Sequence, residues 1–252
     1  MKIVAGLFSA LLAFNSHAEG PCTNSIKWLA ADLPPFIWEQ RDGPHGFGHE
    51  LIAAMSGHMG CQPDIRFYPW ARAVKTAAEG KKYGVLPLAR TPEREASFKW
   101  LIRLVSVKYA FFGRSGPIAG MEAVDLNNIE QLRTQRIGVL RGSPIPKNLR
   151  DKNFTNIVYE KSYQDLLKMV LLGAIDAIYA GDPMLSAAIE LSGLDPKDFR
   201  SGISLGSADL YLGASPDLDA AEEARWLRAY ETIQKDGTVT RLQKKYFNRR
   251  LP

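Results

Sequence analysis

The sequence predicts an α/β protein, a two-lobed clamshell in which each lobe has a mostly parallel sheet flanked by helices. Short apolar strands alternate with helices from residue 26 to 88, and the alternation restarts after residue 120. This alternation is typical of parallel sheets with crossover helices. One long strand candidate, Arg103–Gly113, separates the two α/β units, and another, Ala208–Gly213, follows the second unit. Two crossing strands between two lobes predict a cleft at the carboxyl ends of both sheets.

The first unit is punctuated by proline and glycine, which end or open its elements. Asp32-Leu33-Pro34-Pro35-Phe36 breaks the first strand, Gly43 to Gly48 reads as a loop, and Pro69 opens the second helix. The predicted elements are, in order, a strand at Ile26–Ala31, a helix around Glu50–Met55, a strand at Ile65–Tyr68, a helix from Trp70 to Gly80 and a strand at Gly84–Leu88.

The second unit repeats this pattern, with Ser162 as the N-cap of its strongest helix. Its predicted elements are helix Ile129–Leu132, strand Arg136–Leu140, helix Pro144–Arg150, strand Asn156–Tyr159, a helix after Ser162, strand Ile175–Ala180 and helix Pro183–Leu191.

Two helices, Asp219–Gln234 and Thr238–Phe247, close the chain. Their buried stripe is expected to be core that returns to the first lobe; it contains Trp226, Leu227, Tyr230, Val239, Leu242 and Tyr246. The predicted lobes are 22–108 with 213–252, and 109–212 including the hinge strands.

The first eighteen residues are predicted to be a cleaved signal peptide. Lys2 provides a positive start, Ile3–Phe14 is a short apolar stretch, and Ser16-His17-Ala18 is a small-x-small cleavage site. We therefore expect a mature protein in the periplasm, monomeric and without a membrane span. The formal net charge is +5, but basic and acidic residues are interspersed, which does not support nucleic-acid binding.

The two cysteines are predicted to form a disulfide. An even cysteine count in an exported chain favours one. Cys22 and Cys61 each lie just before a predicted strand, so adjacent parallel strands would place them side by side. Two free thiols are the alternative.

Thr91-Pro92-Glu93-Arg94 follows the strand that ends at Ala89 and reads as a helix start. Arg94 is unusual there, since a cation in the first turn opposes the helix dipole. A guanidinium at the carboxyl end of a strand is well placed to bind a carboxylate. From these residues alone, a surface arginine is the competing interpretation.

Histidines and an acid near the first helix form a weak candidate for a metal site. His45 and His49 are separated by Gly46 and Gly48, and the helical spacing needed for paired ligands is absent. With Glu50 and His58 they are better read as loop or cap residues, and we expect neither a metal nor a cofactor.

Several motifs, in order along nearly the whole mature chain, resemble the periplasmic solute-binding proteins of family 3, the polar amino-acid type. The motifs are Leu33-Pro34-Pro35-Phe36, Gly46-Phe47-Gly48-His49-Glu50-Leu51, Trp70 through Gly80, Thr91-Pro92-Glu93-Arg94, Ile137 through Ser143, Gly173 through Ala177, and Asp236-Gly237-Thr238. The resemblance implies the periplasmic-binding-protein fold and an interlobe ligand site.

The resemblance also implies roles for individual residues. Arg94 would pair bidentately with a ligand carboxylate, which suits its planar fork. The turn at Gly142 and Ser143 would offer backbone N–H donors from the other lobe. Phe36 and Trp70 would stack on or wall the ligand, with core packing as the alternative for both.

Other positions depart from the family pattern. An aromatic is replaced by Leu33, and two hydroxyls that help to bind amino acids correspond to Pro87 and Ala89. The acid that grips a ligand ammonium would fall at Gly181, with Asp182 one residue late. Arg72 is an added cation that would face the cleft or the solvent. The anion site is thus kept, whereas the ammonium site is altered.

Three functions follow. The first is a solute-binding protein that delivers a small carboxylated solute, an amino acid or a related compound, to an ABC permease. The second is an enzyme on the same scaffold, resembling cyclohexadienyl dehydratase, for which Asp182 or Glu95 would be the candidate acid. No paired carboxylates at a catalytic spacing support it, and we predict no catalytic residues. The third is a ligand-sensing subunit.

Overall fold

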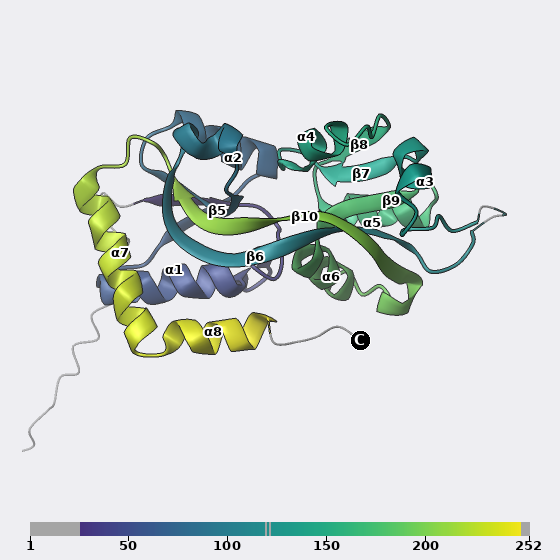
Figure 1. The fold of residues 1–252 in the computed structure, drawn as a ribbon. Helices are drawn as coiled ribbons and strands as arrows, with labels where there is room; N and C mark the ends of the chain where they lie inside the picture. The colour runs from purple at the N-terminus through teal and green to yellow at the C-terminus, as the bar shows by residue number, and fades with distance from the viewer. Residues whose placement is uncertain (1–25, 119, 121, 248–252) are drawn as a thin grey trace, which may run out of the picture.

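The computed structural model describes residues 26–118, 120 and 122–247 of the protein (Figure 1). The predicted signal peptide at residues 1–18 and Cys22 lie outside the described residues. Within the described ranges, no helix combines the length and the apolar composition that crossing a membrane requires.

One eight-stranded sheet runs through both halves of the molecule. Its strands are β1 (Lys27–Ala30), β4 (Asp64–Phe67), β5 (Tyr83–Ala89), β6 (Lys99–Arg114), β7 (Ile137–Leu140), β8 (Ile157–Glu160), β9 (Ala177–Gly181) and β10 (Phe199–Ala214). They are arranged in the order β4-β1-β5-β10-β6-β9-β7-β8. β1 is parallel to β4 and β5, and β7 is parallel to β8 and β9. The predicted α/β class, with a parallel sheet in each half, is confirmed.

β6 and β10 are the two crossing strands, and they pair antiparallel along their length. β10 also pairs with β5 of the first half, and β6 pairs with β9 of the second. The halves therefore share continuous hydrogen bonding. β10 is much longer than predicted, because register shifts between Ser201 and Gly206 interrupt the alternation that identifies a strand.

Helices cover both sides of the sheet. They are α1 (Phe47–His58), α2 (Trp70–Glu79), α3 (Ile129–Thr134), α4 (Ile145–Arg150), α5 (Tyr163–Leu171), α6 (Asp182–Leu191), α7 (Ala220–Lys235) and α8 (Thr238–Phe247), with 3-10 turns η1 (Pro92–Ser97) and η2 (Pro196–Asp198). In the first half, α2 lies on one side of the strands, and α1 and α8 lie on the other (Figure 1). The predicted cap of α5 is confirmed, since the Ser162 hydroxyl accepts the Asp165 N–H.

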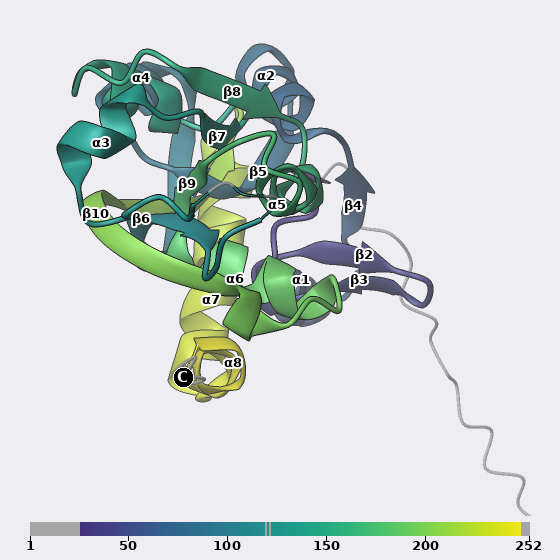
Figure 2. The ribbon, with the colours of Figure 1, turned by 90° about the vertical axis from the view of Figure 1, so that its right-hand side faces the viewer.

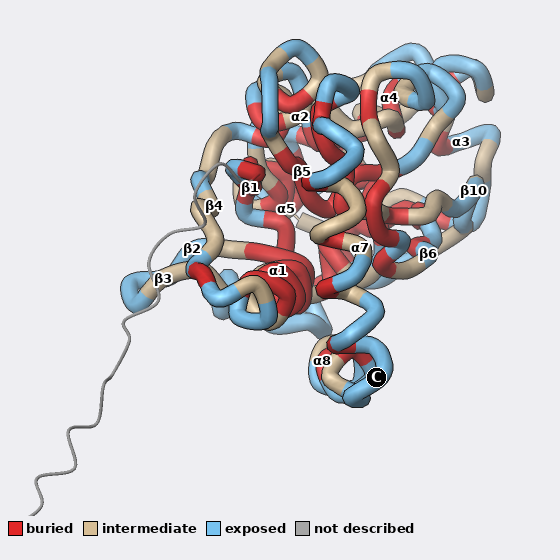
Figure 3. Tube along the Cα trace, turned by 90° about the vertical axis from the view of Figure 1, so that its left-hand side faces the viewer, coloured by how far each residue is buried: buried red, intermediate tan, exposed pale blue. Residues whose placement is uncertain are grey.

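The two C-terminal helices pack on the first half, as predicted. The rings of Trp28 in β1 and Trp226 in α7 meet edge to face, with their centroids 5.1 Å apart. Glu222 accepts a hydrogen bond from Trp226 Nε1 at 2.8 Å. The predicted stripe is buried or partly buried core, and Figure 3 shows the buried positions gathered along α1 and the inner strands. The exact residue bounds of the lobes stay a prediction.

Two local predictions were wrong. The stretch from Gly43 to Gly48, which was expected to be a loop, contains β3 (Gly43–His45) and the first residues of α1. β3 pairs with β2 (Trp38–Gln40) in a hairpin that projects from the body of the molecule in Figure 2. The predicted helix after Thr91 is the short 3-10 turn η1, and the Thr91 side chain makes no capping hydrogen bond. Phe98, which is buried and extended, ends this turn where β6 begins, and that leaves no room for an α-helix.

The strand adjacency behind the predicted disulfide is present. β1 and β4 are parallel neighbours, with Lys27 opposite Asp64, and Cys61 is buried just before β4. Cys22 lies outside the described residues, so the Cys22–Cys61 bridge stays a prediction.

Candidate functional site: a cavity between the two halves

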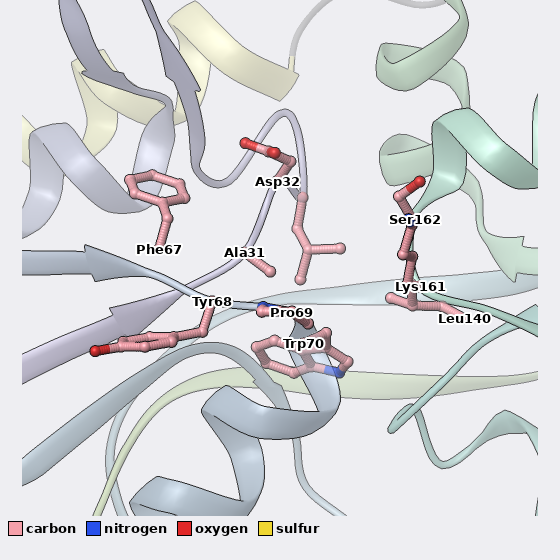
Figure 4. Close-up of a pocket in the computed structure, with 10 residues that line it drawn as sticks. Ala31, Asp32, Phe67, Tyr68, Pro69, Trp70, Leu140, Lys161 and Ser162 are labelled. Carbon is pink, nitrogen blue, oxygen red and sulfur yellow. The ribbon is translucent and has the colours of Figure 1, made fainter.

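Two adjoining cavities lie where the halves face each other. The larger measures about 270 Å³ and the smaller, deeper one about 20 Å³. Leu33, Trp70 and Leu140 line both. Figure 4 shows Asp32 and Trp70 of the first half on one side of the larger cavity, and Leu140, Lys161 and Ser162 of the second half on the other. The volume is slightly below the usual range of small-molecule sites, which indicates a small ligand.

The cavity walls come from the carboxyl ends of parallel strands, as the sequence predicted. In the first half, Leu33 follows β1 and Trp70 opens α2 after β4. In the second, Leu140 ends β7, and Lys161 follows β8. The strand ends of both sheets thus face the same space.

Arg94 lies in the deeper cavity, on η1 just after β5. Its guanidinium donates to the carbonyl oxygen of Ala89 at 3.2 Å and, across the two halves, to that of Gly142 at 2.6 Å. Burial lowers the pKa of Arg94, although the nearby Tyr109 and Glu93 raise it. An arginine carries more N–H donors than these two carbonyls use. A planar, partly desolvated cation is thus held at the inner end of the cavity.

The Gly142–Ser143 turn reaches Arg94 through a carbonyl group. Both the backbone N–H and the hydroxyl of Ser143 donate to the carbonyl oxygen of Leu140, at 3.2 and 2.7 Å. The Ser143 N–H is therefore engaged within the turn, although it was expected to face an anion. Gly142 has φ +85°, and a Cβ there would lie 2.6 Å from Ala71 Cα of α2. This turn is a close contact between the halves.

The surroundings of Arg94 are mostly apolar. Leu33 and Ala89 are buried and line the deeper cavity, as expected, and Trp70 is 4% exposed. Tyr109, Tyr163 and Met184, which were not singled out in the sequence, complete the lining from the second half. They occupy a crossing strand and two helices, where an apolar pattern reads as ordinary core.

The two tyrosines beside Arg94 are neutral at physiological pH. Burial raises the pKa of Tyr109 to about 12, although Arg94 lowers it, and burial also raises the pKa of Tyr163. The Tyr163 hydroxyl contacts Met184 Sδ at 3.9 Å. These groups add hydrogen-bonding capacity to the inner cavity but no charge.

Two further charged side chains line the larger cavity, which is the outer of the two. Neither was predicted from the sequence as a site residue. Asp32 follows β1, and its Oδ1 accepts the backbone N–H of Glu39 at 2.9 Å. Lys161 faces the cavity from the second half. The feature of the sequence that could have identified them is the position of each residue just after a parallel strand.

Four predicted residues line neither cavity: Gly142, which reaches Arg94 only through its carbonyl group, and Phe36, Asp182 and Arg72. Phe36 is fully buried and packs on Phe47 and Phe247, with ring centroids 6.5 and 5.4 Å away. It is therefore a core residue, which was the alternative interpretation. Asp182 is exposed and accepts a hydrogen bond from the Ser186 hydroxyl at 3.1 Å. Arg72 is exposed on α2, because its helical position turns it away from the face that carries Trp70.

The histidines considered for metal binding are dispersed. His45 contacts Asp42 at 2.8 Å, and His58 contacts Asp236 at 3.7 Å. Burial lowers the pKa of His49. Among residues 26–118, 120 and 122–247, no three metal-ligating side chains of the His, Cys, Asp or Glu type gather in one place.

Comparison with known proteins gives a consistent result. The family model described as bacterial extracellular solute-binding proteins, family 3, matches residues 28–249. A probable amino-acid-binding protein of Bacillus subtilis, YxeM, is 24% identical over 98% of this chain and 93% of its own length.

Solved structures share the fold at lower identity. An ancestral arginine-binding protein bound to glutamine superposes with a TM-score of 0.77 at 16% identity, covering 90% of this chain and all of its own. A histidine kinase sensor domain similar to periplasmic binding proteins gives 0.75 at 18% identity, covering 88% and 96%. These likenesses confirm the two-lobed clamshell.

Proposed function

Because the chain belongs to the bacterial extracellular solute-binding proteins of family 3, we propose that it captures a small carboxylated solute between its lobes and delivers it to an ABC permease. The solute is an amino acid or a related compound. The observation that carries this proposal is Arg94, a cation at the inner end of an interlobe cavity. No carboxylate among the described residues lies within ion-pair distance of its guanidinium.

The carboxylate preference follows from the cost of burying charge. A buried guanidinium is stabilised most by an anion that accepts two parallel hydrogen bonds. The Arg94 guanidinium already donates to a carbonyl oxygen of each half, Ala89 and Gly142. A ligand carboxylate bound to this guanidinium would therefore be connected to both lobes. Binding would then bias the protein towards the closed arrangement of its lobes.

A binding role is favoured over catalysis. Asp32 is the only carboxylate that lines the cavities within the described ranges, and general acid–base chemistry on such a solute needs a positioned proton donor and acceptor. Family membership and an amino-acid-binding relative point the same way. We propose export to the periplasm by the signal peptide and a monomeric mature protein.

A sensing role is the second candidate. It rests on the similarity to a histidine kinase sensor domain, which shares the fold at 18% identity. Transport and sensing use the same capture step, so the ligand site proposed here serves either.

Arg94→Ala tests the capture site. The purified mature protein is screened by thermal shift and calorimetry against amino acids, dicarboxylates and prephenate-like acids. We expect the variant to bind the best carboxylate at least about 30-fold more weakly, because removing one member of a buried charge pair typically costs about 2–5 kcal/mol.

Arg72→Ala is the matched control, since it removes an exposed arginine that lies outside the cavities. It should bind as the wild type does. Unchanged affinity in Arg94→Ala, with a normal melting temperature, would refute the site. Conversion of a bound acid into product would refute the binding role.

A further inference from the structure

The charges that line the cavities are divided between an inner and an outer end. Arg94 is the only charged side chain in the inner lining, and Asp32 and Lys161 are the charged side chains in the outer lining, among the residues that the structure describes. Leu33, Trp70 and Leu140 line both cavities and form the apolar surface that they share. The summed charge is +1, which complements a solute with two carboxylates and one ammonium group.

Among the described residues, no carboxylate lines the inner cavity to balance an ammonium group. The remaining lining around Arg94 is aliphatic, aromatic or hydroxyl-bearing. Asp182, where an acid might have been expected, is exposed and bonded to Ser186. Glu93, next to Arg94 in sequence, is exposed and faces Lys147 at 3.5 Å. A desolvated ammonium beside the carboxylate on Arg94 would therefore lack an anion, which is costly.

The outer cavity is lined by one charge of each sign, one from each half. Asp32 comes from the first half and Lys161 from the second, on opposite sides of the cavity in Figure 4. The Glu39 N–H fixes one oxygen of Asp32. The adjacent Ser162 hydroxyl is engaged with Asp165, through its carboxylate at 2.7 Å and its N–H at 3.1 Å. A lining with one carboxylate and one ammonium group complements the charges of an ammonium next to a carboxylate.

Resting on the proposed function, we propose that the solute is an acidic amino acid held with its side-chain carboxylate on Arg94. Its α-ammonium group pairs with Asp32 and its α-carboxylate with Lys161. The methylene chain of the ligand lies against Trp70, which lines both cavities. In this orientation the desolvated inner end receives only an anion, and the zwitterionic end stays at the more hydrated outer end.

Two amides of one acid reveal the orientation. Aspartate, glutamate and 2-aminoadipate are first compared by calorimetry, and the tightest is taken forward. Its side-chain amide removes the charge at Arg94, whereas its α-amide removes the charge at Lys161. We expect the side-chain amide to bind at least about 30-fold more weakly and the α-amide less than about tenfold, because Lys161 is exposed. The reverse ranking would overturn the proposal.

Variants then locate the outer partners. Lys161→Gln should weaken the acid several-fold yet leave binding of its α-amide unchanged, since the lost charge has no counterpart in that ligand. Asp32→Asn should remove most of the preference for the amino acid over the corresponding dicarboxylate. Asp182→Asn is the control, because this carboxylate lies outside the cavities. It should change neither the affinity for the acid nor the preference for the amino acid over the dicarboxylate. Equal effects of Lys161→Gln on acid and α-amide would contradict the assignment.

The two levels of proposal fail differently. If Arg94→Ala abolishes binding while the amide ranking is reversed, the carboxylate site stands and the orientation is wrong. If Arg94→Ala binds every acid as the wild type does, the proposed capture site itself is wrong.

Discussion

At the scale of single residues, Gly142 is a point of very close approach between the halves. Its φ of +85° suits glycine, and a Cβ would lie 2.6 Å from Ala71 Cα and 2.9 Å from Ala71 Cβ. The same residue accepts the hydrogen bond from Arg94. Its missing side chain therefore permits the close contact beside the proposed ligand site.

Gly142→Ala is expected to weaken ligand binding at least about tenfold, because the added methyl group keeps the halves apart. Calorimetry with the best acid measures the effect. Gly237→Ala is a matched control: its φ is +82°, but nothing lies within 4 Å of the added Cβ. Both variants should lose about 1 kcal/mol of stability from the left-handed backbone, and only Gly142→Ala should lose affinity. Equal affinities would contradict the contact.

The site residues were predictable to different degrees. The Thr-x-x-Arg motif identified Arg94, whose location now supports that choice. Phe36 was not separable from core in advance, since an aromatic beside a buried strand fits either place. Asp32 and Lys161 belong to no motif in the sequence. They line the same cavity only because the folded sheet edges of the two halves meet there.

At the scale of elements, an ion pair connects a residue within η1, Glu95, to Arg90, which precedes the turn. Arg90 Nε and Nη2 donate to the two carboxylate oxygens of Glu95 at 2.9 and 2.5 Å. The same guanidinium lies over the rings of Trp100 and Tyr211, at 5.4 and 5.5 Å. Because the pair brackets Arg94 in the chain, it orients the turn that carries that residue.

Glu95→Gln is expected to weaken ligand binding about threefold while changing the melting temperature little, since an exposed pair contributes about 1 kcal/mol or less. Asp209→Asn is the control, because it removes a comparable exposed partner, that of Arg103, without touching η1. Parallel calorimetry and thermal unfolding separate orientation from stability. A fall in melting temperature without a change in affinity would contradict the role.

Most elements were predicted close to their observed bounds because their periodicity is local. Helix α2 and strand β5 are examples. The exceptions have tertiary causes: β10 is held as a long bulged strand by its pairing with β6, and η1 is shortened by the burial of Phe98. The strand that pairs with β10 is distant in the sequence, and the burial of Phe98 depends on tertiary packing, so neither cause can be identified from the local sequence.

At the scale of the whole molecule, a surface ion pair between α4 and η1 connects the halves outside the cavities. Lys147 Nζ of α4 lies 3.5 Å from Glu93 Oε1 of η1. Lys147 also contacts Asp151 of its own half at 2.8 Å. Lys147 is thus positioned to stabilise closure by an electrostatic attraction that salt weakens.

Lys147→Gln is expected to reduce affinity about two- to threefold at low ionic strength and to have no effect at high salt, because exposed pairs are weak and screened. Titrations of the best acid at two salt concentrations measure this. Asp151→Asn, which removes the partner within the same half, should not weaken binding at either concentration. A loss that persists in high salt would exclude the electrostatic explanation.

The sequence by itself determined the α/β class, the two crossing strands, the family motifs and the choice of Arg94, because each depends on local patterns or on their order along the chain. Tertiary structure decided what those patterns could not express. It buried Phe36, left Arg72 and Asp182 in solvent, and closed the turn at Ser143 on itself. It also brought Asp32 and Lys161 into the lining of one cavity, because residues from opposite halves become neighbours only where the carboxyl ends of two sheets meet.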